Sequence, residues 1–169
     1  MRVDRAREAA LDALAACRRN GAWIDGALKQ VLKRDGLSGR DAAFASRIAY
    51  GVMQNRIYLD RCLARCLTQR PEKLEPLLLD ILRIGAYQIL FMDKVPVNAA
   101  VNEAVEMAKA HKLSRAAGLV NAVLRNVDRR RGEPHAIADR LEALSVQTSH
   151  PRALVERMVG LLGLKEAEA

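Results

Sequence analysis

Aromatic side chains and cysteines are scarce in this chain of 169 residues. Aromatic residues make up 4% of it, and the aromatic and Thr-rich runs typical of strands are missing, so helices are favoured. Three cysteines, Cys17, Cys62 and Cys66, do not make a disulfide framework. The longest uncharged run in the most apolar segment, residues 84–92, is far shorter than the roughly 20 residues of a membrane span. We therefore expect a soluble, cytoplasmic, all-α protein without a membrane partner.

Motifs for catalysis and metal binding are missing as well. The sequence has no G-x-G-x-x-G, no Walker lysine loop and no H-E-x-x-H. Cys62 and Cys66 are four residues apart, which places two thiols on one helix face, but no histidine or third cysteine lies near them in sequence. Core packing explains such free cysteines better. His111, His135 and His150 have no nucleophile at a motif spacing. We expect no catalytic residue, metal or cofactor in this chain.

Basic residues, by contrast, are abundant. The chain has 28 Lys and Arg against 20 Asp and Glu, a formal net charge of +8, which suits a polyanionic partner such as RNA. They concentrate near the start of the chain and again around residues 109–131. If the helices carrying these two groups pack side by side, they form one positive surface that phosphates can follow. The candidate RNA-binding residues are Arg2, Arg5, Arg7, Arg18, Lys109, Lys112, Arg115, Arg125 and Arg129.

An alternative stays open for these residues: they are solvated helix faces whose charge serves only solubility. If RNA does bind, phosphate contacts and shape should matter most. Base stacking should contribute little, because the chain has six aromatic residues and most fall in apolar stripes.

The pattern of apolar residues predicts a central helix over residues 77–92. This segment is apolar on every side and should therefore be buried. Gly85 in its middle indicates a close helix contact. Before it we expect a helix capped by Asp4, a second over 23–33, and a third over 38–68 with a break near 51–56. Ser38 with Asp41 is typical of a capping box.

After this segment we expect helices over 97–110 and from a Ser114 cap to about residue 131. The remaining residues, 132–169, differ in kind. They predict one helix over 135–144 and another from about 151 to 162.

Two segments in this region, VPVNAAVNEAVEMAK and AAGLVNAVLRNV, closely resemble the NusB fold, an all-helical RNA-binding domain. The stretch DRAREAALDAL is similar to the basic first helix of that fold. The resemblance covers residues 3–131. It implies an all-α, NusB-like helical bundle of two small halves over residues 1–131. Residues 132–169 then form a C-terminal helical linker.

Three longer segments indicate which of two groups of NusB-like proteins this chain resembles more. RDAAFASRIAYGVMQNRIYLD, DILRIGAYQILFMDKVP and SHPRALVERMVGLLG look more like the N-terminal domain of Sun/Fmu-type methyltransferases than like the antitermination factor NusB. Those enzymes make 5-methylcytosine in small-subunit ribosomal RNA. Ala15 and Cys17 also stand where NusB commonly has aromatic residues.

The resemblance therefore implies a domain that positions small-subunit ribosomal RNA for a catalytic methyltransferase domain in cis, which would use S-adenosylmethionine. A ribosomal protein is a further candidate partner. None of the three cysteines follows a proline, as the family's catalytic cysteine does, so we expect that this chain is not itself an enzyme. Two alternatives remain: a protein-interaction module, or an antitermination factor of the NusB type.

Overall fold

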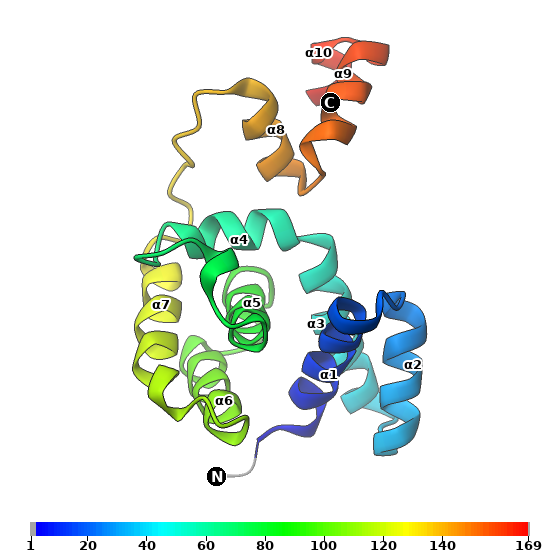
Figure 1. Ribbon diagram of the computed structural model, residues 1–169, viewed down its shortest axis with the longest axis vertical. Helices are drawn as coiled ribbons and strands as arrows, with labels where there is room; N and C mark the ends of the chain where they lie inside the picture. Colours follow the sequence, from blue (N-terminus) through cyan, green and yellow to red (C-terminus); the bar gives the residue numbers. More distant parts are fainter. Residues whose placement is uncertain (1–2, 169) are drawn as a thin grey trace.

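The computed structural model describes residues 3–168, which form helices and no strand (Figure 1). This confirms the predicted all-α class. Within these described residues, no helix is long and apolar enough to cross a membrane. The elements are α1 (Arg5–Asn20), α2 (Ile24–Asp35), α3 (Gly39–Gln54), α4 (Arg56–Ala64), η1 (Pro71–Lys73), α5 (Pro76–Phe91), α6 (Val97–Ala110), η2 (Ser114–Ala116), α7 (Ala117–Arg129), α8 (Arg140–Thr148), α9 (Arg152–Leu162) and α10 (Leu164–Glu168).

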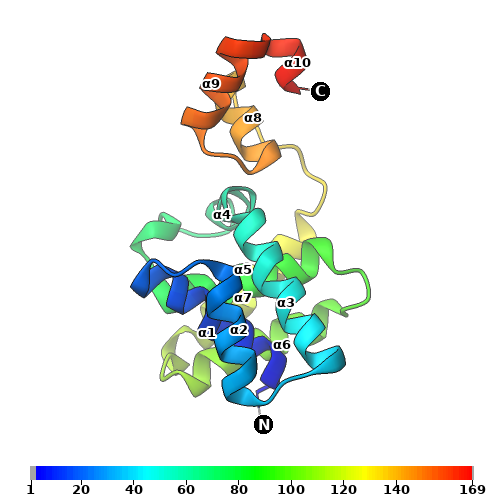
Figure 2. The ribbon, with the colours of Figure 1, turned by 90° about the vertical axis from the view of Figure 1, so that its right-hand side faces the viewer.

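Helix α5 lies at the centre of the fold, as its apolar sequence predicts. Eleven of its residues are buried, among them Ile81, Leu82 and Ile84. It packs against α1 and α3 on one side and against α4, α6 and α7 on the other (Figures 1 and 2). Burying each such side chain contributes about 1.5–3 kcal/mol to the stability of the fold. Because α5 contacts both groups of helices, it joins them into one core.

Two glycines allow helices to approach α5 or its side chains closely. A Cβ on Gly85 would lie 2.5 Å from Cδ1 of Leu124, which confirms the predicted close contact, here with α7. A Cβ on Gly51 of α3 would lie 1.9 Å from Cζ of Tyr87. Any larger residue at either position would force the neighbouring side chain to move.

Several helix boundaries follow from local sequence. The Asp4 side chain accepts a hydrogen bond from the backbone N–H of Arg7 at 3.0 Å, which confirms the predicted cap of α1. The predicted break in the long third helix falls at Asn55, between α3 and α4. Its side-chain amide donates to the carbonyl oxygen of Gly51 at 2.8 Å and so satisfies a carbonyl at the end of α3.

One predicted cap is right in position but makes no hydrogen bond, and another is wrong. Ser38 does precede α3, but its side chain makes no capping hydrogen bond, because Gly39 enters the helix with a φ of +56°. Ser114 begins the 3₁₀ turn η2, and α7 starts only after Ala116. In both places the backbone path into the helix differs from the one that places a serine hydroxyl over the first turn.

The predicted helix over residues 135–144 is also wrong at its start. Helix α8 begins at Arg140, and Asp139 caps it by accepting from the N–H of Glu142 at 2.9 Å. Residues before Asp139 form an irregular connection whose His135 ring packs edge-on against Tyr58, with centroids 5.3 Å apart. This contact with α4 holds the connection in a non-helical path.

The C-terminal region, α8 to α10, is attached to the bundle through α4 (Figures 1 and 2). The Ser149 hydroxyl accepts from the backbone N–H groups of Ile57 and Tyr58, at 3.2 and 3.4 Å, and so caps the start of α4. Arg65, the residue that follows α4, forms an ion pair with Glu133 at 2.7 Å. The two hydrogen bonds of Ser149 therefore join the end of α8 to the start of α4, and the ion pair holds the connection that precedes α8. Helices α9 and α10 lie farther from the bundle (Figures 1 and 2).

Candidate nucleic-acid interface

The start of α1 lies beside α6, the arrangement that a joint positive surface requires. The backbone N–H of Asp4 donates to Oε2 of Glu103 at 3.1 Å. One turn later, the Glu8 carboxylate lies 2.9 Å from Nε2 of His111, at the end of α6. These two bonds bring the start of α1 next to the turn that leads from α6 into η2.

Five of the predicted RNA-binding residues lie exposed near this junction or along α7. Arg5 donates to the backbone carbonyl of Asp35, Arg125 to Oδ1 of Asn98 at 2.7 Å, and Arg129 to Oδ1 of Asn126. These acceptors are neutral, so Arg125 and Arg129 keep their charge unneutralised. Arg5, in contrast, also lies near the Asp35 carboxylate, whose pKa is lowered by Arg34 and, to a smaller extent, by Arg5. Within residues 3–168 the exposed cations that form no ion pair include five of the predicted ones: Arg5, Lys112, Arg115, Arg125 and Arg129.

Acidic residues interrupt this positive surface. Lys109 is exposed but forms an ion pair with Glu106 at 2.8 Å. The hydrogen bond from Lys109 holds the pKa of Glu106 below its ordinary value, so this carboxylate stays charged at neutral pH. Together with Glu8 and Glu103, it dilutes the charge where α1 meets α6. The strongest uncompensated charge therefore lies on η2 and α7.

Arg7 points inward, toward α5, whereas Arg18 stays exposed and pairs with a carboxylate of α5. Arg7 is only 9% exposed: its Nε donates to Oε1 of Gln88 at 2.8 Å, and its guanidinium lies 4.9 Å from the ring centre of Phe44. The Nε of Arg18 lies 3.1 Å from the Asp80 carboxylate. Arg7 is therefore not available at the surface, and Arg18 is exposed but partly neutralised by Asp80. Arg2 lies outside the described residues.

The sequence pattern of α1 could have indicated that Arg7 is buried. Arg7 and Arg18 share one helix face with Ala10 and Leu14, both buried in the core, at spacings of three and four. An arginine in line with core residues faces the core, and its charge then needs partners there. Gln88 and Asp80, the buried polar residues of α5, are those partners.

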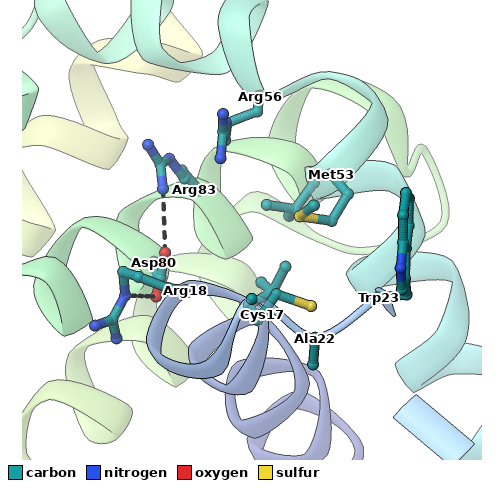
Figure 3. A pocket seen from close by; sticks show the side chains of 11 residues that line it. Cys17, Arg18, Ala22, Trp23, Met53, Arg56, Asp80 and Arg83 are labelled. Carbon is teal, nitrogen blue, oxygen red and sulfur yellow. Dashed lines mark hydrogen bonds and ion pairs between the residues drawn. The ribbon is translucent and has the colours of Figure 1, made fainter. Parts of the chain in front are cut away.

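The sequence-based search missed a cleft of about 510 Å³ that opens between the end of α1, the α3–α4 junction and the start of α5. Trp23, Met53, Arg56 and Arg83 line it (Figure 3). Trp23 is 87% exposed, the most exposed of the large apolar side chains. The available signal was its position: Trp23 immediately precedes α2 and lies outside that helix's apolar stripe.

The three cysteines are not activated as nucleophiles. Burial raises the pKa of the Cys17, Cys62 and Cys66 thiols above the ordinary value, so they are protonated at neutral pH. Among residues 3–168, no three His, Cys, Asp or Glu side chains gather as metal ligands. The geometry of the exposed cations instead suits the binding of phosphates.

Comparisons with known proteins agree with this fold. The NusB family matches residues 4–129. The protein named "Probable ribosomal RNA small subunit methyltransferase B" of Bacillus subtilis (strain 168) is 36% identical over 170 residues, which cover 99% of this chain and 38% of that protein. The chain thus spans less than half the length of this relative.

Two solved structures share the fold. The structure of PH0851 superimposes with a TM-score of 0.76 and 19% identity, covering 99% of this chain and 38% of that one. NusB of T. maritima superimposes with a TM-score of 0.69 and 23% identity, covering 78% of this chain and 94% of that one. The chain belongs to the NusB family, and over nearly its whole length it matches the N-terminal part of Sun-type ribosomal RNA methyltransferases.

Proposed function

We propose that this chain is an RNA-binding domain that positions small-subunit ribosomal RNA for a cytosine-5 methyltransferase domain in cis. One observation carries the proposal: five exposed cations on α1, η2, α7 and the α6–η2 turn have no ion-pair partner within residues 3–168. Four of the five, Lys112, Arg115, Arg125 and Arg129, lie along one stretch of chain, from the α6–η2 turn to the end of α7. The similarity to a ribosomal RNA methyltransferase supports the choice of RNA.

Binding would rest on contacts to phosphates. Guanidinium groups pair with phosphate oxygens through parallel hydrogen bonds, and each contact releases counterions from the RNA. Arg125 and Arg129 lie one helical turn apart on α7, so both can follow one strand. Arg7 is not part of this surface, because its guanidinium is buried against Phe44 and Gln88.

The C-terminal helices would connect this RNA surface to the catalytic domain. Helix α9 exposes Leu154, Met158, Leu161 and Leu162, an apolar face of the kind that another domain covers. The Ser149 cap joins the end of α8 to the start of α4, and the Arg65–Glu133 ion pair holds the connection before α8 near the end of α4. A domain docked on α9 would therefore have a defined position relative to bound RNA. S-adenosylmethionine would bind that catalytic domain.

Charge reversal tests the proposal. The double variant Arg115→Glu and Arg125→Glu should weaken binding to small-subunit ribosomal RNA fragments by roughly ten-fold or more, because it replaces two phosphate contacts with repulsion. The matched control is the double variant Lys29→Glu and Lys33→Glu on α2, which changes the net charge equally at two exposed residues and should bind as the native chain does. Filter binding at one fixed salt concentration provides the measurement. Equal binding by the double variant and the control would overturn the proposal.

The protein-interaction alternative predicts a different result. The exposed apolar face of α9 favours some protein contact. If that contact is the main function, both charge-reversed variants should still bind a separate catalytic domain, and neither should differ from the native chain toward RNA. A pull-down with the catalytic domain, made beside the RNA titration, separates the two functions.

A further inference from the structure

We infer that the Trp23 cleft is a second RNA contact, which takes one unpaired nucleotide with its base stacked on Trp23 and its phosphate near Arg56 and Arg18. The inference rests on the proposed function, since it assumes that RNA is the partner. It departs from the sequence-based expectation that stacking contributes little. The cleft is separate from the exposed cations of η2 and α7 and consists of different elements.

The indole of Trp23 is the first observation. Tryptophan usually buries much of its large apolar surface, yet this side chain is 87% exposed. It stands at the rim of the cleft with a ring face turned toward Met53 (Figure 3). Nucleobases stack on exposed aromatic faces of this kind, whatever their sequence. A free ring face beside a cleft is therefore suited to an unpaired base.

The opposite side of the cleft is positive. Asp80, whose side chain is 5% exposed, accepts from Nε of Arg18 and from Nη1 of Arg83, both at 3.1 Å. Arg83 is held further by Asp60, at 2.7 and 2.8 Å. Three arginines line the cleft, so even with Asp80 and Asp60 counted the local charge is positive. An anionic ligand is therefore favoured.

Two guanidinium groups remain available to a phosphate. Arg18 contacts Asp80 through Nε, and its two terminal nitrogens make no hydrogen bond within residues 3–168. Arg56 is exposed and forms no ion pair or hydrogen bond in the same part of the chain. Asp80 is thus a positioning residue: it orients Arg18 while Arg56 stays free. A nucleotide offers the matching combination of a flat base and a phosphate.

The size and lining of the cleft fit one nucleotide. Its volume of about 510 Å³ lies within the range of small-ligand pockets. Leu14, Val52 and the protonated thiol of Cys17 add apolar surface. Bases in an A-form duplex are paired and stacked, so only a base from a loop, bulge or single strand can enter. The cleft therefore selects unpaired RNA.

Trp23 is the only tryptophan in the chain, so its fluorescence reports on the cleft directly. We expect a short single-stranded oligoribonucleotide to quench this fluorescence in the full chain, and a duplex of the same sequence to leave it nearly unchanged. Trp23→Ala should weaken single-strand binding by about ten-fold, the loss of one stacked base. Trp23→Phe should retain part of the affinity, because it keeps an aromatic face.

Arg56→Gln should weaken RNA binding. It should also make the slope of the binding constant against salt concentration, both as logarithms, shallower by the share of about one phosphate contact. Lys29→Gln, an exposed change on α2, is the control for both variants. Because Trp23 and Arg56 are exposed, thermal unfolding should be nearly the same for all variants, and this measurement separates binding defects from folding defects.

The outcomes separate this inference from the proposed function. If the native chain does not bind RNA at all, both the proposed function and the cleft inference are overturned. If the native chain binds RNA but its fluorescence does not change and Trp23→Ala has no effect, only the inference about the cleft is overturned. Quenching by a separate catalytic domain, without quenching by RNA, would also overturn it and identify the cleft as a protein contact.

Discussion

Helices α5 and α9 both carry many large apolar side chains, yet they lie in opposite environments. Helix α5 is surrounded by α1, α3, α4, α6 and α7, and eleven of its residues are buried. Helix α9 buries only Val155, and Leu161 is 79% exposed. Apolar content alone therefore does not define a core. What decides is whether other elements of the chain cover the face.

The largest expected effect concerns α5. Leu82→Ala should lower the free energy of unfolding by about 2–5 kcal/mol, because it removes fully buried atoms and leaves a cavity. Leu161→Ala on α9 is the matched control and should change it by less than about 0.5 kcal/mol. Urea unfolding curves of both variants measure the difference. A comparable loss in the two would contradict the contrast between the helices.

A smaller loss of stability should follow when the contact between the C-terminal region and α4 is weakened. Ser149→Gly removes the hydroxyl that caps α4 but keeps a residue suited to the positive φ of 55°. Loss of a hydrogen bond of this kind costs about 1 kcal/mol. Hydrogen exchange should become faster at the N–H groups of Ile57 and Tyr58, whereas α5 should be unaffected. Unchanged exchange at both amides would show that the cap does not hold the two regions together.

The smallest effect should be a pH dependence of the same attachment. Burial, followed by repulsion from Arg65 and Arg61, holds the pKa of His135 below its ordinary value of 6.5. The unfolded chain then binds the proton more readily, so the stability from a neutral His135 is complete above about pH 6.5 and is lost as the pH falls through the lowered pKa. Acid should therefore loosen residues 133–139 before it affects the bundle.

Hydrogen exchange in residues 133–139, compared above and below about pH 6.5, measures this effect. His135→Gln should remove the pH dependence, which separates His135 from His111 and His150. An equal pH dependence in the variant would assign the effect to another group.

Much of the fold was predictable because its signals are local. The apolar run of α5, the Asp4 cap and the break at Asn55 each depend on residues close in sequence. Gly85 indicated a close contact, although only the structure identifies Leu124 as its neighbour. The start of α8 was not predictable, because the contact between His135 and Tyr58 joins residues far apart in sequence.

The candidate site was predictable only in part. Charge clustering named the exposed arginines of η2 and α7, but pairing with α5 removes Arg7 from that surface. The Trp23 cleft consists of residues from four distant elements, so no sequence window contains it. Whether a charged or aromatic side chain is available to a ligand depends on its partners in space, which periodicity alone does not give.

The salt dependence of RNA binding tests the central claim most directly. If the five exposed cations contact phosphates of single-stranded RNA, the logarithm of the binding constant should fall with the logarithm of salt concentration with a slope of about −3.5. Arg125→Gln should make that slope shallower by about 0.7, the share of one contact. Binding that does not vary with salt, or a slope unchanged by Arg125→Gln, would contradict the account.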